Sequence, residues 1–321
     1  MKDWEQEVLG HYEIDVTAMK KVRGGVFCES KQGIYLMSET KLSEKRLGML
    51  ENLYDHMKGK GFSNIDCIVR DRENALVCEL EDGTRYILRS WFDGRECDVK
   101  RENELLSATK KLAKLHKMLR GAELESYKGE DAQQVFFRHN RELRKVRSFI
   151  RGKVDKGKFE NAFLSHFENM YHWAEVALAR LEESDYKKIP RSFIHGDYNY
   201  HNILMLHNGV ATTNFEHFEE NIQATDLYYF LRKTMEKHQW DIALGDKMLD
   251  YYQRFVTFSK EEVEYIGILL AYPEKFWKAA NAYSRAKKSW IPAKSLEKLE
   301  LVTWQMKEKE QFLRHLFGFQ L

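Results

Sequence analysis

The feature that most constrains the fold is a short polar island inside a long, otherwise helical stretch. Residues 193–216 read FIHGDYNYHNILMLHNGVATTNFE. Within them Asn208-Gly209 joins two short apolar runs, which is the strongest local signal for a β-hairpin. A hairpin with that turn brings position 214 back beside position 202. We therefore expect Asp197, Asn202 and Asn214 to gather at one end of a hairpin.

The rest of the chain divides into a strand-rich first part and a helical remainder. Strands are predicted where short apolar runs lie between turn residues, and helices where apolar side chains recur every three or four positions. Ser43 is a plausible helix cap, and Asp82-Gly83 is a strong turn signal. In chain order the predicted elements are strands 25–30 and 33–38, helix 42–58, strands 65–69, 75–80 and 86–91, helices at about 103–120, 130–151 and 158–184, the polar island, and a helical tail from about residue 223.

This order of elements predicts an α+β, protein-kinase-like fold with two lobes. Residues 1–91 would form a small antiparallel sheet carrying one helix. Residues 99–321 would form a large, mainly helical lobe that contains the non-helical island 190–216. The polar segment 92–98, with Gly94 at its centre, is interpreted as the link between the lobes. Only three prolines occur in 321 residues, which favours long helices because proline interrupts them.

Charge and cysteine usage argue against several classes of protein. The chain has 52 basic and 50 acidic residues and no single basic block, so we expect no nucleic-acid binding driven by overall charge. The pairs Lys110–Lys111 and Lys287–Lys288 are interpreted as solvated helix faces. No run of 18 apolar residues occurs and the N-terminus is too acidic for a signal peptide, so no membrane span is expected. Four scattered cysteines fit reduced thiols of an intracellular protein rather than a zinc site: Cys28, Cys67, Cys78 and Cys97,.

The polar island carries the residue types that phosphoryl transfer needs. A carboxylate accepts the proton of the substrate hydroxyl, while an amide and a second carboxylate hold magnesium against the phosphates. His195, Asp197 and Asn202 follow the spacing His-x-Asp-x-x-x-x-Asn of a kinase catalytic loop. The structural alternative is an irregular loop in which His195 and Asp197 only cap the backbone. The hairpin behind the motif and the sheet-rich region ahead of it favour the catalytic interpretation.

Six blocks extend this pattern over nearly the whole chain: residues 86–96 (YILRSWFDGRE), 112–116 (LAKLH), 195–202 (HGDYNYHN), 225–227 (TDL), 272–277 (YPEKFW) and 282–290 (AYSRAKKSW). With these blocks the chain resembles the CotS family of spore coat proteins, within the aminoglycoside/choline phosphotransferase (protein-kinase-like) superfamily. The resemblance implies that Asp197 is the catalytic base, Asn202 a magnesium ligand and Asp226 a structural aspartate under the catalytic loop. It further implies loop support by His195 and a nucleotide cleft that includes Ser38, Arg89 and Trp91.

Three positions depart from a working kinase. The magnesium-binding aspartate expected after the hairpin is Asn214, which carries no charge, and Glu216 is the substitute two residues on. The phosphate-gripping lysine expected on the second predicted strand is Ser38, or Met37 in the alternative register. The phosphate-covering loop, expected at residues 20–26, has two glycines but no Gly-x-Gly-x-x-Gly pattern,. Together these departures predict that ATP and Mg²⁺, if they bind, bind weakly.

The leading hypothesis is a catalytically degenerate, kinase-like spore coat protein that acts in coat assembly by binding other coat proteins. The resemblance implies cytoplasmic synthesis in the sporulating mother cell, followed by a place in the spore coat. The alternative is an active ATP-dependent phosphotransferase on a small-molecule or sugar hydroxyl, since a pure scaffold has no physical need of Asp197 and Asn202. A third hypothesis is a switch that binds ATP without turnover.

Overall fold

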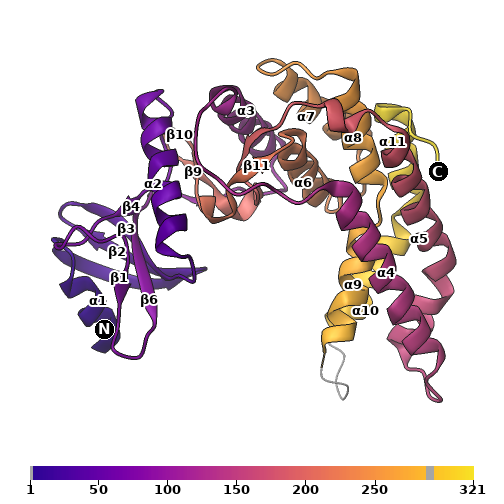
Figure 1. Ribbon diagram of the computed structural model, residues 1–321, viewed down its shortest axis with the longest axis horizontal. Helices are drawn as coiled ribbons and strands as arrows, with labels where there is room; N and C mark the ends of the chain where they lie inside the picture. Colours follow the sequence, from indigo (N-terminus) through magenta and orange to yellow (C-terminus); the bar gives the residue numbers. More distant parts are fainter. Residues whose placement is uncertain (1–2, 287–292) are drawn as a thin grey trace. The chain divides into compact units, whose positions relative to one another are not determined.

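The structure, a computed structural model, describes residues 3–286 and 293–321 (Figure 1). The pair Lys287–Lys288 and Trp290 lie outside the described residues. Within the described part of the chain, no helix is both long enough and apolar enough to cross a membrane. All four cysteines are buried and none forms a disulfide.

The chain forms two compact units. The first unit comprises the residues up to Tyr127 together with Ser192–Glu220, and the second comprises Lys128–Arg191 and Asn221–Leu321. The polar island therefore belongs almost wholly to the same unit as the N-terminal sheet. The lobe boundaries at residues 91 and 98 stay a prediction.

The first unit is built on an antiparallel sheet with the strand order β1-β2-β3-β6-β4, and β5 also pairs with β6. The strands are β1 (Val16–Val22), β2 (Gly25–Ser30), β3 (Gly33–Glu39), β4 (Ile68–Val69), β5 (Cys78–Glu79) and β6 (Arg85–Ser90). The predicted hairpin and three later strands are present, although β4 and β5 are shorter than predicted. Strand β1 and helix α1 (Asp3–Gly10) were not predicted. Because β1 is an edge strand with mostly exposed side chains, it lacks the apolar alternation that reveals a strand,.

Helix α2 (Glu44–Gly59) begins where the sequence predicts because Ser43 caps it. The Ser43 Oγ accepts a hydrogen bond from the N–H of Arg46 at 3.3 Å,. The apolar side of α2 is buried along its length, while Val8 of α1 packs with Met37 of β3. Leu36, the neighbour of Met37 on β3, is also buried. Since adjacent side chains of a strand point to opposite faces, both faces of the sheet are covered at this strand.

The polar island folds into the predicted hairpin, formed by β9 (Ile203–Leu206) and β10 (Gly209–Thr212). Leu206 pairs with Gly209, so the two loop residues are His207 and Asn208, one position earlier than the turn read from the sequence. Strand β7 (Arg95–Glu96), inside the predicted linker, pairs with β9 and extends the hairpin to three strands. The other elements around it are α3 (Glu102–Leu119), β8 (Ser192–Ile194), the short 3-10 helices η2 (Tyr200–Asn202) and η3 (Phe215–His217), and β11 (Glu219–Asn221).

The second unit is helical. Its elements are α4 (Ala132–Arg151), α5 (Lys158–Glu183), the short 3-10 helix η1 (Tyr186–Lys188), α6 (Ala224–Met235), α7 (Ile242–Gln253), α8 (Lys260–Ala271), α9 (Glu274–Arg285), α10 (Ala293–Trp304) and α11 (Met306–Phe317). Helices α4 and α5 lie side by side, and α9 packs on α4 (Figure 1). Aromatic rings fill the core between them, where Phe163 of α5 stacks on Phe276 of α9. The long helices agree with prediction within two residues because their apolar periodicity extends over many turns,.

A buried histidine links α4 to α9 through the sequence block at residues 272–277. His139 is almost completely buried, and its ring stacks on that of Trp277 with centroids 3.4 Å apart. Its Nδ1 has no hydrogen-bond partner in the described part of the chain, although a Glu274 carboxylate oxygen lies 3.6 Å away. Burial lowers the pKa of His139 to about 4, against a smaller opposing effect of Glu274. The histidine is therefore neutral in the folded protein near pH 7.

This burial predicts a loss of stability in mild acid. In the unfolded chain the His139 pKa returns to about 6.5, so between pH 6.5 and 4 the unfolded state binds more protons than the folded state. Stability must then fall as the pH is lowered through this window. Urea unfolding of the wild type at pH 7 and pH 5 should show a loss about 2 kcal/mol greater than that of His139→Phe, which keeps the ring stacking but does not titrate. Equal losses in the two proteins would contradict this account.

Candidate functional site

The predicted catalytic loop is held by a buried histidine. The Asp197 N–H donates to His195 Nδ1 at 3.2 Å, and His195 Nε2 in turn donates to the Thr213 carbonyl oxygen at 3.0 Å. These two bonds require a neutral imidazole with its proton on Nε2. His195 is fully buried. Its two hydrogen bonds connect the start of the motif to Thr213, directly after strand β10.

The side chains of Asp197, Asn202 and Asn214 meet at the open end of the hairpin. Asn202 Nδ2 donates to Asp197 Oδ2 at 2.9 Å, and Asn214 Nδ2 lies 3.4 Å from Asn202 Oδ1. The other oxygen of Asp197 accepts from Asn199 Nδ2 at 3.0 Å. The loop thus holds the carboxylate in one orientation. The juxtaposition expected from the spacing is present, while the catalytic and metal-binding roles of these residues stay predictions.

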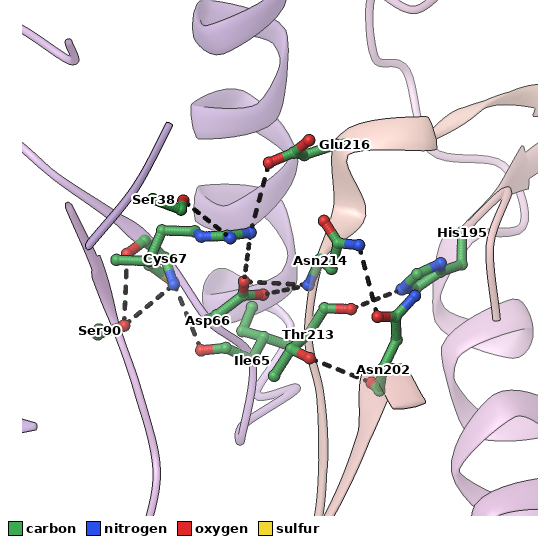
Figure 2. A network of polar contacts seen from close by, with 11 residues as sticks. Ser38, Ile65, Asp66, Cys67, Ser90, His195, Asn202, Thr213, Asn214 and Glu216 are labelled. Atoms are coloured by element: carbon green, nitrogen blue, oxygen red, sulfur yellow. Dashed lines mark hydrogen bonds and ion pairs between the residues drawn. The ribbon is translucent and has the colours of Figure 1, made fainter. Parts of the chain in front are cut away.

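A buried aspartate that the sequence did not single out fixes Asn214. Asp66 lies in the segment between α2 and β4, is fully buried, and accepts the Asn214 N–H at 3.0 and 3.1 Å (Figure 2). Asn214 has φ +67° and ψ +59°, a left-handed conformation that asparagine tolerates better than most residues. The signal in the sequence was one acidic residue inside the apolar run 65–69. Burial of a carboxylate requires a charged or hydrogen-bonding partner, and the run predicted only a strand.

The partner is Arg89, whose guanidinium contacts both Asp66 and Ser38. Arg89 Nη1 is 3.2 Å from Asp66 Oδ2, and Nη2 donates to Ser38 Oγ at 3.2 Å. Leu36 pairs with Arg89 across β3 and β6, so Ser38, two residues on, lies on the same face. Met37 instead packs in the apolar core. Ser38 is thus the residue facing Arg89, and burial raises the pKa of Asp66 against the opposing effects of Arg89 and the Asn214 N–H.

Glu216 is directed toward the same arginine. Its Oε1 lies 3.6 Å from Arg89 Nη1 (Figure 2). Protein kinases pair the strand lysine with a glutamate on the following helix, but α2 contributes a fully buried phenol, Tyr54, which packs edge-on against Phe215. Burial raises the pKa of Tyr54 well above its ordinary value, and nearby Asp66 adds to the increase. Among the described residues, Arg89 takes its carboxylate partners from Asp66 and Glu216 rather than from α2.

The predicted phosphate-covering loop is a tight turn. Val22 pairs with Gly25, so only Arg23 and Gly24 connect β1 to β2. Arg23 Nη1 lies 2.7 Å from His201 Nδ1, which is also 2.5 Å from a Glu96 carboxylate oxygen. One ring nitrogen cannot accept from Arg23 and donate to Glu96 at once, so the tautomer of His201 selects between these partners. Through His201 the turn contacts the catalytic loop itself.

Two further predicted residues have different surroundings. Trp91 follows β6, and the Arg89 guanidinium carbon lies 5.8 Å from its ring centroid, so Trp91 borders the same cluster as Ser38. Asp226 is a buried residue of α6 in the second unit. Its predicted hydrogen bond to the catalytic loop stays a prediction.

The side chains gathered here differ from the donors that hold magnesium and triphosphate in a kinase. In the described residues, no group of three or more His, Cys, Asp or Glu side chains is arranged to hold a metal ion. The oxygen of Asn202 faces the amide nitrogen of Asn214, and Glu216 is paired with Arg89. Asp197 supplies the carboxylate that contacts the amide pair. Kinases instead give the metal a dedicated aspartate and the phosphates a lysine.

Comparisons with solved structures place this fold among small-molecule kinases. An aminoglycoside phosphotransferase from Alicyclobacillus acidocaldarius superposes with a TM-score of 0.85 at 19% identity, over 97% of this chain and 94% of that chain. The spectinomycin phosphotransferase APH(9)-Ia in complex with ADP and spectinomycin gives 0.66 at 12%, over 96% and 98%. A microcompartment-associated aminopropanol kinase gives 0.66 at 11%, over 98% and 97%. These similarities confirm the predicted α+β, protein-kinase-like fold.

The family comparison is more specific than the structural one. None of the curated proteins compared with the chain matches it. The sequence profile of the family described as "Spore coat putative kinase YutH" matches residues 5–316, which confirms the predicted resemblance to spore coat proteins of the CotS type. With nearly its whole length matched, a kinase-like fold and a kinase-type loop, the chain belongs to this spore coat family of kinase-like proteins.

Proposed function

We propose that this protein is a catalytically degenerate, kinase-like component of the spore coat that acts in coat assembly by binding other coat proteins. Its family supports association with the coat. By the same resemblance, it would be made in the cytoplasm of the sporulating mother cell and then incorporated into the coat. Whether the protein binds partners instead of catalysing a reaction depends on the residues that stand where a kinase binds phosphate and metal.

The observation that carries the proposal is that Arg89 is bound by other side chains of the protein. In a kinase, the strand lysine and the metal provide the positive charge that the triphosphate requires. Here the guanidinium is bound to Asp66, Ser38 and Glu216, so its positive charge is already taken up by carboxylates of the protein. A bound triphosphate would have to compete with these internal contacts. Such a cluster favours a stable binding protein over an enzyme that exchanges nucleotides.

One observation favours the alternative of an active ATP-dependent phosphotransferase on a small-molecule or sugar hydroxyl. Asp197 is held by Asn199 and Asn202 in a single orientation, as a general base must be. A scaffold has no evident use for that arrangement. The binding protein and the active phosphotransferase therefore differ in whether a nucleotide binds next to Asp197.

Nucleotide calorimetry separates these proposals. We expect the wild type to bind ATP with Mg²⁺ more weakly than millimolar and to show no robust transfer to sugars or aminoglycosides. Asn214→Asp should tighten metal-dependent ATP binding by about tenfold, or 1.4 kcal/mol, because it returns a carboxylate to the metal position. Aspartate also tolerates the left-handed backbone there. Turnover should remain absent because position 38 stays uncharged.

The matched control is Asn208→Asp, which makes the same chemical change in the exposed hairpin loop at the other end of β9 and β10. It should leave ATP affinity unchanged. A coupled kinase assay on the same proteins completes the test. Tight ATP binding and turnover by the wild type, lost in Asp197→Ala, would overturn the binding-protein proposal in favour of the enzyme.

A further inference from the structure

The outer side of helix α4 carries exposed cations between two exposed aromatic rings. Its inner side, including Leu143 and Ile150, packs in the core of the second unit. We call the opposite side the basic face of α4 and define it by five exposed residues: Phe137, Arg141, Arg144, Lys145 and Phe149. Phe137 and Phe149 remain 50% and 47% exposed. Both rings therefore offer apolar surface to a partner.

The cations of this face have no acidic partner among the residues that the structure describes. Residues 138–158 contain nine Lys or Arg residues and two acidic ones, an excess that the balanced total charge conceals. Arg138 is paired with Glu130, and both Arg147 and Arg151 approach Glu168. In contrast, the three cations of the basic face, Arg141, Arg144 and Lys145, form no ion pair with any residue that the structure describes. The cluster is not apparent in the sequence because apolar core residues separate the cations along the helix.

We propose that the basic face of α4 is the docking surface for an acidic segment of another coat protein. This inference rests on the proposed binding function and identifies its surface. The three cations lie within about one helical turn, which suits two or three carboxylates of a partner. The two phenylalanines are twelve residues apart, or about 18 Å along the helix, and would pack against apolar residues on either side of those carboxylates. Aromatic residues and arginine are the types enriched at protein interfaces.

Other anionic partners fit this face less well. A protein that contacts about six to ten phosphates of a nucleic acid needs a correspondingly large set of cations, whereas this face has three without an ion-pair partner in the described part of the chain. Helices that lie in a bilayer surface bury a continuous apolar side in the lipid. The continuous apolar side of α4 is already buried against α5 and α9. An acidic polypeptide with flanking apolar residues is the partner whose charge and shape complement the face.

The test uses the full chain and a labelled synthetic helical peptide of about 20 residues, with central glutamates and a leucine on each side twelve positions apart. Fluorescence anisotropy at low ionic strength, where surface charges are least screened, measures its affinity. The triple variant Arg141→Glu, Arg144→Glu, Lys145→Glu should weaken binding by roughly ten- to hundredfold. The double variant Phe137→Ala, Phe149→Ala should also weaken it. Thermal melts establish that each variant is folded.

A charge-matched control reverses three exposed lysines elsewhere, Lys60→Glu, Lys117→Glu and Lys128→Glu, and should change affinity by less than about threefold, as for scattered surface charges. The inference is wrong if this control weakens binding as much as the α4 variant, or if the peptide does not bind at all. Tighter wild-type binding to single-stranded DNA or to phosphatidylglycerol vesicles would also overturn it. A kinase assay of the wild type keeps the two proposals separate. A wild type that binds no peptide and shows no turnover contradicts only this docking surface, whereas turnover contradicts the proposed function itself.

Discussion

Replacing Asp66 by alanine is expected to lower the free energy of unfolding by about 3 to 5 kcal/mol, the usual cost of removing one partner from a buried ion pair. Asp66 is fully buried, and Arg89 exposes only a small part of its side chain. Without the carboxylate, the guanidinium keeps only Ser38 and the more distant Glu216. The Asn214 N–H also loses its acceptor. Urea unfolding measured at neutral pH provides the number.

A double variant separates the effect of the Asp66–Arg89 ion pair from that of the hydrogen bond between Asp66 and Asn214. Asp66→Asn with Arg89→Met removes both charges while leaving an oxygen that can accept the Asn214 N–H. We expect it to be more stable than Asp66→Ala. Replacing both partners of a buried ion pair often changes the free energy of unfolding little, whereas removing one partner leaves a buried charge unpaired and lowers it strongly. The two sites are in contact, so their effects should not add. If Asp66→Ala unfolds at the same urea concentration as the wild type, the cluster around Arg89 does not stabilise the first unit.

Gly196→Ala is expected to destabilise the protein by about 3 kcal/mol or more, from backbone strain combined with overpacking. Gly196 has φ +78°, in a region that residues with a β-carbon rarely adopt, and an added methyl group would overlap the His217 carbonyl oxygen. The loop between His195 and Asp197 would have to move to relieve this contact. Hydrogen exchange of the Asp197 amide, which donates to His195, should report that movement together with the loss of stability.

Gly83→Ala is the matched control for backbone strain. Gly83 has nearly the same φ of +80°, but a methyl group there would meet no atom within 4 Å. We expect it to cost about 1 kcal/mol from its left-handed backbone alone. The difference between the two variants then measures the close approach of residues 196 and 217. Equal costs would mean that the loop accommodates the methyl group and that the approach is not essential.

The sequence by itself determined the elements whose signals are local. Helix α2 has a Ser43 cap and a long apolar repeat, and both hold in the structure. The hairpin β9–β10 forms because apolar runs flank a short turn, and it brings Asn214 to Asn202. Spacing along the chain was also sufficient to identify the kinase-type loop. In each case neighbouring residues contain the interaction that decides the outcome.

Only the tertiary structure decided which residues meet around the positions that depart from a kinase. Ser38, Asp66, Arg89 and Glu216 are separated by up to 178 positions, and no local pattern indicates that one arginine contacts all three of the others. Their association follows from the pairing of β3 with β6 and from the burial of Asp66, because a carboxylate removed from water must find a cation or hydrogen-bond donors. The edge strand β1 escaped prediction for the opposite reason: its exposed side chains carry no burial pattern, and backbone pairing with β2 alone defines it.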